Sequence, residues 1–357
     1  MRYIPCLLVI VCACGARTGA SLDEVPPARA FDEAPPAGGL DPNGAPVCQG
    51  SPGEPVVLGE ANPFNNIAVD ATHVYFAQTL PPNESPQSRL MRMPKAGGTP
   101  EPLYTGSYAE FVLSASHLFL VRRQEGVAGL AFELVRVPRA GGASEVVGQG
   151  SGETTSLAVA PDGSVLVTSQ YGQGPKGLWR WRPGGALTHL FELTGAHEVT
   201  ATAEAAYVVH DGTPNSKRAL TRVSLADATA ITLLDDAGYS SLLVLDGDEL
   251  CSSGSYQIAR YLLGPSTASG EKLAEGGQMG VLAVDERHVY FADGGSYNDD
   301  LPPPKPPNVP GSIRRVARRG GAVEVLVTEG RNVHALAVDD CHVYWTSHRG
   351  LVRMRKP

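Results

Sequence analysis

Short apolar runs alternate with polar turns along the chain from residue 54 to the C-terminus. One pattern recurs almost unchanged: an apolar run ending in Ala-Val-Asp, a turn, and a second run that begins with His-Val-Tyr. It occupies residues 66–77, 281–292 and 335–346. Two apolar runs joined by a tight turn at Asp predict a β-hairpin. Weaker copies begin near Phe111, Leu157, Val199 and Leu242, which gives seven hairpins in all.

Each of the first six hairpins is followed by two further apolar runs, and the last hairpin by one. The first of these runs carries an arginine between apolar residues, at Arg92, Arg136, Arg180, Arg222, Arg260, Arg315 and Arg353. The second is a short run that we predict to be a strand, at residues 101–104, 144–147, 189–191, 231–234, 271–273 and 323–326. The repeating unit is therefore a four-stranded meander of about 40 to 50 residues, the size of one blade of a β-propeller.

We expect an all-β fold made of seven such four-stranded blades. The seventh unit ends at Pro357 after its third strand, and residues 55–58 have the spacing of the missing fourth strand. An N-terminal strand in that place closes the ring and removes an exposed sheet edge. The alternative is a six-bladed propeller, in which the weak hairpin near Val199 is misread.

The repeat also carries a family resemblance. The hairpin is followed by an arginine-containing strand that leads into a basic residue, an alanine and two glycines, as at residues 92–98 and 136–142. This combination resembles bacterial relatives of the YWTD-type propellers of lipoprotein receptors, over nearly all of residues 54–357. Only Tyr344, Trp345 and Thr346 approach the name-giving tetrapeptide. The resemblance therefore implies an architecture and no receptor-type ligand.

The N-terminal segment has the features of an export signal. Arg2 precedes an apolar stretch, ending at residue 13, that is too short to span a membrane as a permanent helix. Residues 11–14, Val-Cys-Ala-Cys, resemble a bacterial lipobox, which implies lipidation of Cys14; cleavage at an ordinary signal-peptidase site nearby is the alternative. Gly15 in place of Asp implies, by resemblance to sorted lipoproteins, the outer membrane of the cell envelope.

The chain thus divides into a signal peptide (1–13), a lipidated cysteine with its tether (14–52) and the propeller (53–357). The tether is rich in Pro, Gly and Ala and almost free of aromatic residues. Such a segment buries too little apolar surface to offset its conformational entropy, so we expect it to be extended. The expected partner at this end is a lipid bilayer, reached through Cys14.

Charge and motifs narrow the function classes. The 357-residue chain has a formal net charge of -8 and no cluster of Lys and Arg, which excludes a nucleic-acid footprint. The sequence contains no Gly-x-Ser-x-Gly elbow, phosphate-binding glycine loop, His-Glu-x-x-His or Cys-x-x-Cys motif. We therefore expect no cofactor.

Lipidation of Cys14 would leave Cys48, Cys251 and Cys341 in an oxidising compartment. Cys48 precedes the closing strand and Cys341 lies in the first turn of the last blade. We predict a disulfide between these two that fixes the closure of the ring. Cys251 lies in a middle strand and is expected to be a buried apolar residue.

Polar side chains precede several innermost strands, at the face where the centre of a propeller opens. They are Asn66, Glu110, Glu153, His197, Glu198, Tyr239, Gln278, Asn332 and His334. The connections between second and third strands vary in length, leave on the same face, and add Tyr171, Tyr297 and Asn298. Variable loops on a rigid scaffold are where binding usually takes place, so we expect this face to be functional. The recurrent turn Asp and blade Arg residues are expected to be structural.

Two function classes follow from these observations. The favoured one is an extracytoplasmic binding or scaffold module that presents its loops to a protein, peptide or glycan partner. The alternative is a propeller enzyme, a metal-assisted lyase or hydrolase that uses His197, Glu198 and His334, and only this alternative requires a divalent cation. The enzyme needs those three side chains to meet at one point, whereas the binding module needs an accessible loop surface.

Overall fold

The computed structural model describes Cys48 and most of the chain from Glu54 to Pro357. The described residues are 48, 54–61, 66–79, 88–124, 130–212, 218–237, 242–254, 256–276, 279–294, 310–329 and 333–357. The predicted signal peptide, the predicted lipidation site Cys14 and most of the predicted tether lie outside this set. Within these ranges, no helix has the length and apolar character needed to cross a bilayer.

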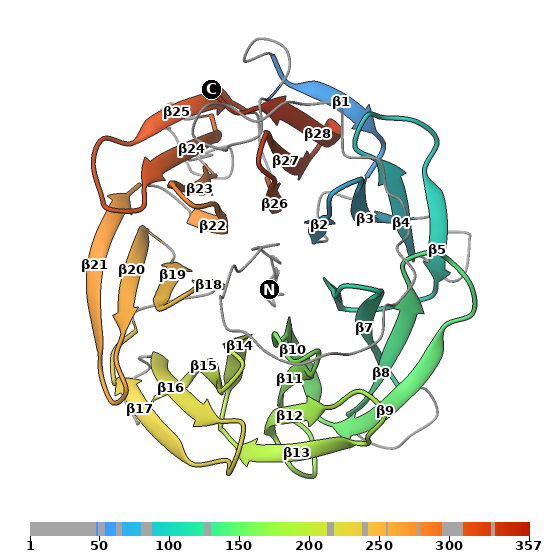
Figure 1. Cartoon of the computed structure of the whole chain (residues 1–357), viewed down its shortest axis with the longest axis vertical. Coiled ribbons are helices and arrows are strands. Elements are labelled where there is room, and N and C mark those ends of the chain that lie inside the picture. The colour runs from blue at the N-terminus through green and yellow to red at the C-terminus, as the bar shows by residue number, and fades with distance from the viewer. Residues whose placement is uncertain are drawn as a thin grey trace, which may run out of the picture.

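Seven antiparallel sheets of four strands are arranged as a ring around a common axis (Figure 1). Blades 1 to 3 consist of β2 (Ile67–Val69), β3 (His73–Thr79), β4 (Ser88–Pro94) and β5 (Glu101–Thr105); β6 (Glu110–Leu113), β7 (His117–Arg123), β8 (Ala131–Pro138) and β9 (Glu145–Ser151); and β10 (Glu153–Val159), β11 (Val165–Gln170), β12 (Gly177–Trp181) and β13 (Leu187–Glu192).

Blades 4 to 6 consist of β14 (Ala196–Ala201), β15 (Ala205–Asp211), β16 (Arg218–Ser224) and β17 (Ala230–Leu234); β18 (Leu242–Asp246), β19 (Glu249–Ser253), β20 (Gln257–Leu263) and β21 (Ala268–Glu275); and β22 (Met279–Val284), β23 (His288–Asp293), β24 (Ser312–Ala317) and β25 (Glu324–Thr328). Blade 7 consists of β26 (Ala335–Val338), β27 (His342–Ser347), β28 (Gly350–Arg355) and β1 (Val56–Gly59). The predicted seven-bladed propeller is confirmed. The six-blade alternative is wrong, because the weak hairpin near Val199 forms the first two strands of a complete blade.

The N-terminal strand closes the ring in the way that the repeat predicts. β1 pairs with β28 in antiparallel register, with Val56 opposite Arg353, and becomes the outermost strand of the last blade. Cys48 and Cys341 form a disulfide across a sequence separation of 293 residues. The segment before β1 is thereby attached to the β26–β27 turn of the blade that β1 completes.

Apolar residues fill the space between neighbouring blades. The second strands are deeply buried: β11 is buried along its whole length, and Tyr75, Tyr290 and Trp345 on three other second strands are at most 1% exposed. A strand covered on both faces needs apolar residues at consecutive positions, which explains the continuous apolar runs in the sequence. Cys251 is 1% exposed on β19, and burial raises the pKa of its thiol to about 12.

Asp70 shows how an Asp at this position shapes the hairpin turn of its blade. One carboxylate oxygen accepts the backbone N–H groups of Thr72 and His73, both at 2.7 Å, and the other accepts the hydroxyl of Tyr75. Asp285 and Asp339 make the same three contacts in their own blades. The prediction that these residues bond their local backbone is confirmed.

The same carboxylates also join neighbouring blades, which the sequence analysis missed. The basic residue three positions after a blade arginine forms an ion pair with the turn Asp of the preceding blade. The pairs are Lys95 with Asp339, Arg139 with Asp70, Arg318 with Asp246, and Lys356 with Asp285. Burial alone would raise the pKa of Asp339, but hydrogen bonds from His342 and Lys95 and the charge of Lys95 hold it below its ordinary value. Four of the seven blade interfaces are therefore clamped by partly buried ion pairs.

The other three interfaces lack both members of the pair. In blades 2, 3 and 4 the residues whose N–H closes the hairpin turn are Ser114, Ala160 and Thr202. The residues three positions after the arginines of blades 3, 4 and 5 are Pro183, Leu225 and Leu263. Each missing Asp is thus matched by a missing base in the next blade, so blades 2 to 5 are joined differently from the rest of the ring.

Candidate functional site

The connections between second and third strands lie on one face of the ring, together with the connections between blades, because the strands within each blade are antiparallel. We call this the loop face, and the opposite side, which carries the hairpin turns, the turn face. Parts of five of these connections, residues 80–87, 125–129, 213–217, 255 and 295–309, are outside the described residues, and so are the candidate contacts Tyr297 and Asn298.

Tyr171 stands on the loop face in the β11–β12 connection, which is described in full. Its side chain is 63% exposed, and its backbone has a φ of 52°, a left-handed conformation that few residues other than glycine adopt. The connection is tied down by Ser151, whose hydroxyl donates to the carbonyl of Pro175 at 2.7 Å, and by Lys176, whose backbone N–H donates to Glu192 at 3.2 Å. The exposed ring is therefore presented on a fixed backbone.

Tyr256 is the second exposed aromatic side chain of this face, and the sequence analysis did not single it out. It is 69% exposed and lies in the β19–β20 connection of blade 5. The connection joins second and third strands, as the one carrying Tyr171 does. An aromatic residue recurring in the same connection of two blades was the signal that could have found it.

The polar residues at the starts of the innermost strands are more deeply buried than expected. Asn66 is 3% exposed, Glu110 is 4% and Glu198 is 0%. The side-chain amide of Asn66 donates to the backbone carbonyl of Phe111 in blade 2, and the carboxylate of Glu110 accepts the backbone N–H of Leu157 in blade 3. These two side chains thus reach sideways to the next blade and join neighbouring blades.

Glu110 and Glu198 are two buried carboxyl groups that repel each other. Glu198 accepts the hydroxyl of Ser156 at 2.9 Å, and one oxygen of each carboxylate has no hydrogen-bond partner. Burial raises the pKa of both groups well above the ordinary value, and repulsion by Glu110 raises that of Glu198 further. Arg218 opposes the shift at Glu198. Ionisation of these two buried carboxyl groups therefore lowers the stability of the native state.

His197 and His334 do not join this pair. His197 occupies a bulge in β14 and contacts Asp211 at 2.8 Å, and burial lowers the pKa of its imidazole. His334 directly precedes β26 in blade 7, and burial lowers its pKa as well. Among the described residues, no three His, Cys, Asp or Glu side chains are grouped as metal ligands.

The remaining candidates from the sequence are distributed as follows. Glu153 begins β10, is exposed, and lies opposite Gln170. Tyr239, Gln278 and Asn332 lie outside the described residues.

The loop face also contains an acidic pocket between blades 3 and 4. It has a volume of about 440 Å³ and is lined by Glu192, Asp211 and Asp235 together with His210 and Thr194. The ring of His210 is held by the hydroxyl of Thr221 at 2.8 Å, and burial lowers its pKa. The pocket therefore offers carboxylates to a ligand that carries hydrogen-bond donors or positive charge.

No protein-family model and no curated protein sequence matches the chain. A solved structure of the computationally designed Ika8 protein superposes with a TM-score of 0.54 at 12% identity, over 82% of this chain and 96% of that one. A chain of a mitotic checkpoint complex gives 0.52 at 10% identity, over 93% and 99%. A chain of a nidogen/laminin complex gives 0.47 at 12% identity, over 68% and 89%. At such identities the first two matches support the fold alone.

Proposed function

We propose that this protein is an extracytoplasmic binding module, held at a bacterial membrane through Cys14, whose loop face binds a protein, peptide or glycan partner. The observation that carries the proposal is the pair of exposed tyrosines, Tyr171 and Tyr256, in equivalent connections of one face. Among the described residues, the other exposed large hydrophobic side chains belong to Val, Ile and Leu residues on or beside the third and outer strands. Tyrosine supplies contact area and a hydrogen-bonding hydroxyl with little loss of conformational entropy.

The rest of the molecule supports this role. A closed ring holds its strands rigidly, and connections of varying length on such a scaffold can present a binding surface without refolding. The repeat, which resembles YWTD-type propellers, supplies that scaffold. The Pro-rich residues 14–52 have the composition of a spacer between the lipid and the ring.

The binding face is tested by site-specific photo-crosslinking in the producing bacterium. A benzoylphenylalanine in place of Tyr171 or Tyr256 is expected to give discrete crosslinked products in the cell envelope, because both rings point into solvent on the loop face. The matched control places the same group at Glu286, an exposed residue of a hairpin turn on the turn face. Equal crosslinking from Glu286, or none from either tyrosine position, contradicts the proposal; protease or glycosidase sensitivity of the product identifies the partner class.

The anchor is tested separately by detergent phase partitioning of the full chain. Cys14→Ser is expected to move the protein from the detergent phase to the aqueous phase, because each buried methylene of an acyl chain contributes about 0.8 kcal/mol to membrane binding. Cys12→Ser is the matched control and is expected to remain in the detergent phase. A wild-type chain that already partitions into water would show that Cys14 carries no lipid.

A further inference from the structure

Most blade arginines are held by an acidic partner on the outermost strand of the same blade. The pairs are Arg92 with Glu101, Arg136 with Glu145, Arg260 with Glu271, and Arg315 with Glu324, at N–O distances of 2.5 to 2.7 Å. Two others donate to a backbone carbonyl of the next blade, Arg353 to Lys95 and Arg180 to Leu225. Six of the seven blade arginines thus have the structural role that the repeat predicts.

Arg222 in blade 4 is the exception. The residue opposite it on β17 is Ile231, where the four paired blades have glutamate. Its guanidinium forms no hydrogen bond or ion pair within the part of the chain that the structure describes. An arginine side chain carries five N–H donors and a permanent charge, so Arg222 can accept an anionic partner from outside the chain.

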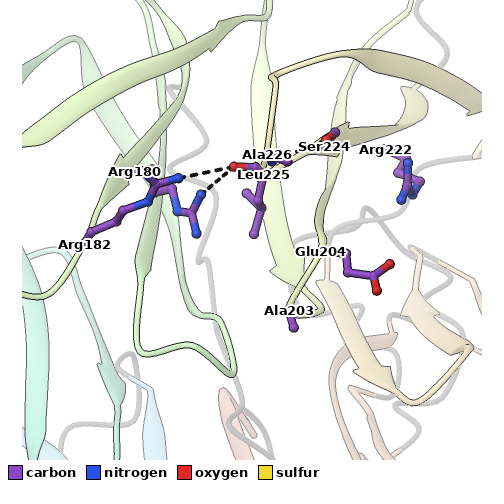
Figure 2. Close-up of a pocket in the computed structure, with 8 residues that line it drawn as sticks. All are labelled: Arg180, Arg182, Ala203, Glu204, Arg222, Ser224, Leu225 and Ala226. Carbon is purple, nitrogen blue, oxygen red and sulfur yellow. Dashed lines mark hydrogen bonds between the residues drawn. The ribbon is translucent and has the colours of Figure 1, made fainter.

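Arg222 lines a pocket of about 490 Å³ on the turn face, between blades 3 and 4. Figure 2 shows Arg180 and Arg182 on one side of this pocket and Arg222 with Glu204 on the other. The turn that follows β16, with Leu225, lies between them. This is one of the interfaces without an Asp–base pair, and the position that elsewhere holds the basic residue is occupied by Leu225.

The charges around the pocket leave an excess of positive charge. Arg180 is neutralised by Asp162 at 2.7 Å. Arg182 has one long contact, at 3.4 Å to the carbonyl of Leu225, and Arg222 has none. Among the described residues that line the pocket, Glu204 is the one carboxylate. Two guanidinium groups therefore face a single carboxylate, on a chain whose net charge is -8.

We propose that this turn-face pocket binds a phosphate or sulfate group of a small organic ligand, with Arg222 as its main contact and Arg182 on the opposite wall. Guanidinium groups match the geometry of such oxyanions and bind them by charge-assisted hydrogen bonds. The volume suits a small organic molecule, and Glu204 offers an acceptor to a hydroxyl of the ligand. The site is independent of the loop face and of the partner bound there.

The test is isothermal titration of the full chain with inorganic phosphate, inorganic sulfate, glycerol 3-phosphate, and glycerol as the uncharged counterpart. The wild type is expected to bind at least one of the three anions and not glycerol. Arg222→Gln is expected to weaken that binding about tenfold or more, because it removes a charge-assisted contact. Which anion binds tightest distinguishes a phosphate ligand from a sulfate ligand.

A second variant keeps the arginine and restores the partner that the repeat prescribes. Ile231→Glu places a carboxylate opposite Arg222 in the register used by the four paired blades, at a position that is 41% exposed, and is expected to weaken anion binding as much as Arg222→Gln does. Val325→Glu adds the same charge at an exposed site on β25 and is expected to change binding less than about twofold. No anion binding by the wild type, or binding that survives both Arg222→Gln and Ile231→Glu, overturns the proposal.

Discussion

Replacing Cys48 and Cys341 together by serine is expected to lower the free energy of unfolding by about 3 to 5 kcal/mol. The disulfide joins residues that are 293 apart, so its loss frees nearly the whole ring in the unfolded state. The native state changes little, because β1 retains its pairing with β28. The double variant therefore removes the covalent link and leaves the strand pairing in place.

The measurement is chemical denaturation followed by tryptophan fluorescence. Trp345 lies in blade 7 beside the closure and Trp181 in blade 3, and both are buried. Wild type in a reducing agent should unfold at the midpoint of the double variant, and the variant itself should not respond to the reducing agent. If the wild type has the same unfolding free energy with and without reducing agent, the disulfide does not stabilise the ring.

The scaffold could be predicted from the sequence because it repeats. A residue such as Asp70 recurs at one place in blade after blade, and only a local turn explains that regularity. The closing strand was predictable for the same reason, since a unit that ends at Pro357 lacks one strand and residues 55–58 supply it. Periodicity thus determines elements, their order and the disulfide partner of Cys341.

Contacts between blades were harder to predict, because they join positions that the repeat does not align. The pairing of Lys95 with Asp339 connects residues at opposite ends of the chain. The sequence nevertheless contains a sign of these ion pairs. Where a blade lacks the turn Asp, the next blade lacks the basic residue three positions after its arginine. The burial of Asn66 and Glu110 was not predictable, since their hydrogen-bond partners, at Phe111 and Leu157, belong to the next blade.

The departures from the repeat are concentrated in one arc of the ring. At the register position of Asn66, the innermost strand has a polar residue in blades 1 to 4 and an apolar residue in blades 5 to 7; the residues are Asn66, Glu110, Ser156 and Glu198, then Leu242, Val281 and Ala335. The interfaces without an Asp–base pair, both pockets, Tyr171 and Tyr256 belong to blades 2 to 5. Blades 6, 7 and 1 keep the regular pattern. We infer that the regular arc maintains the ring and that the divergent arc carries its specific contacts.

Glu198→Gln is expected to stabilise the protein by about 1 to 3 kcal/mol at pH 8 and to have little effect near pH 4.5. The native carboxyl has a raised pKa because it is buried and is repelled by the charge of Glu110, while the charge of Arg218 opposes this shift. In the unfolded chain the group loses its proton near its ordinary value of 4.5. The protonated Glu198 therefore contributes its full stabilisation of the native state at pH values below its pKa in the unfolded chain. This contribution is lost as the pH rises from that value toward the pKa of the native carboxyl.

Glutamine cannot ionise, so Glu198→Gln should avoid most of the decrease in native-state stability at high pH. Glu110→Gln should show the same effect to a smaller extent. Glu153→Gln is the matched control, since Glu153 is exposed at the start of an innermost strand, and no change is expected there. The check is the denaturation midpoint of the three variants at pH 4.5, 6 and 8. Destabilisation by Glu198→Gln at every pH would mean that the ionised carboxylate is a satisfied structural acceptor of Ser156. Stabilisation that grows with pH would mean that the ring keeps two buried acids at the expense of its own stability, which is characteristic of residues retained for binding or proton exchange at the axis.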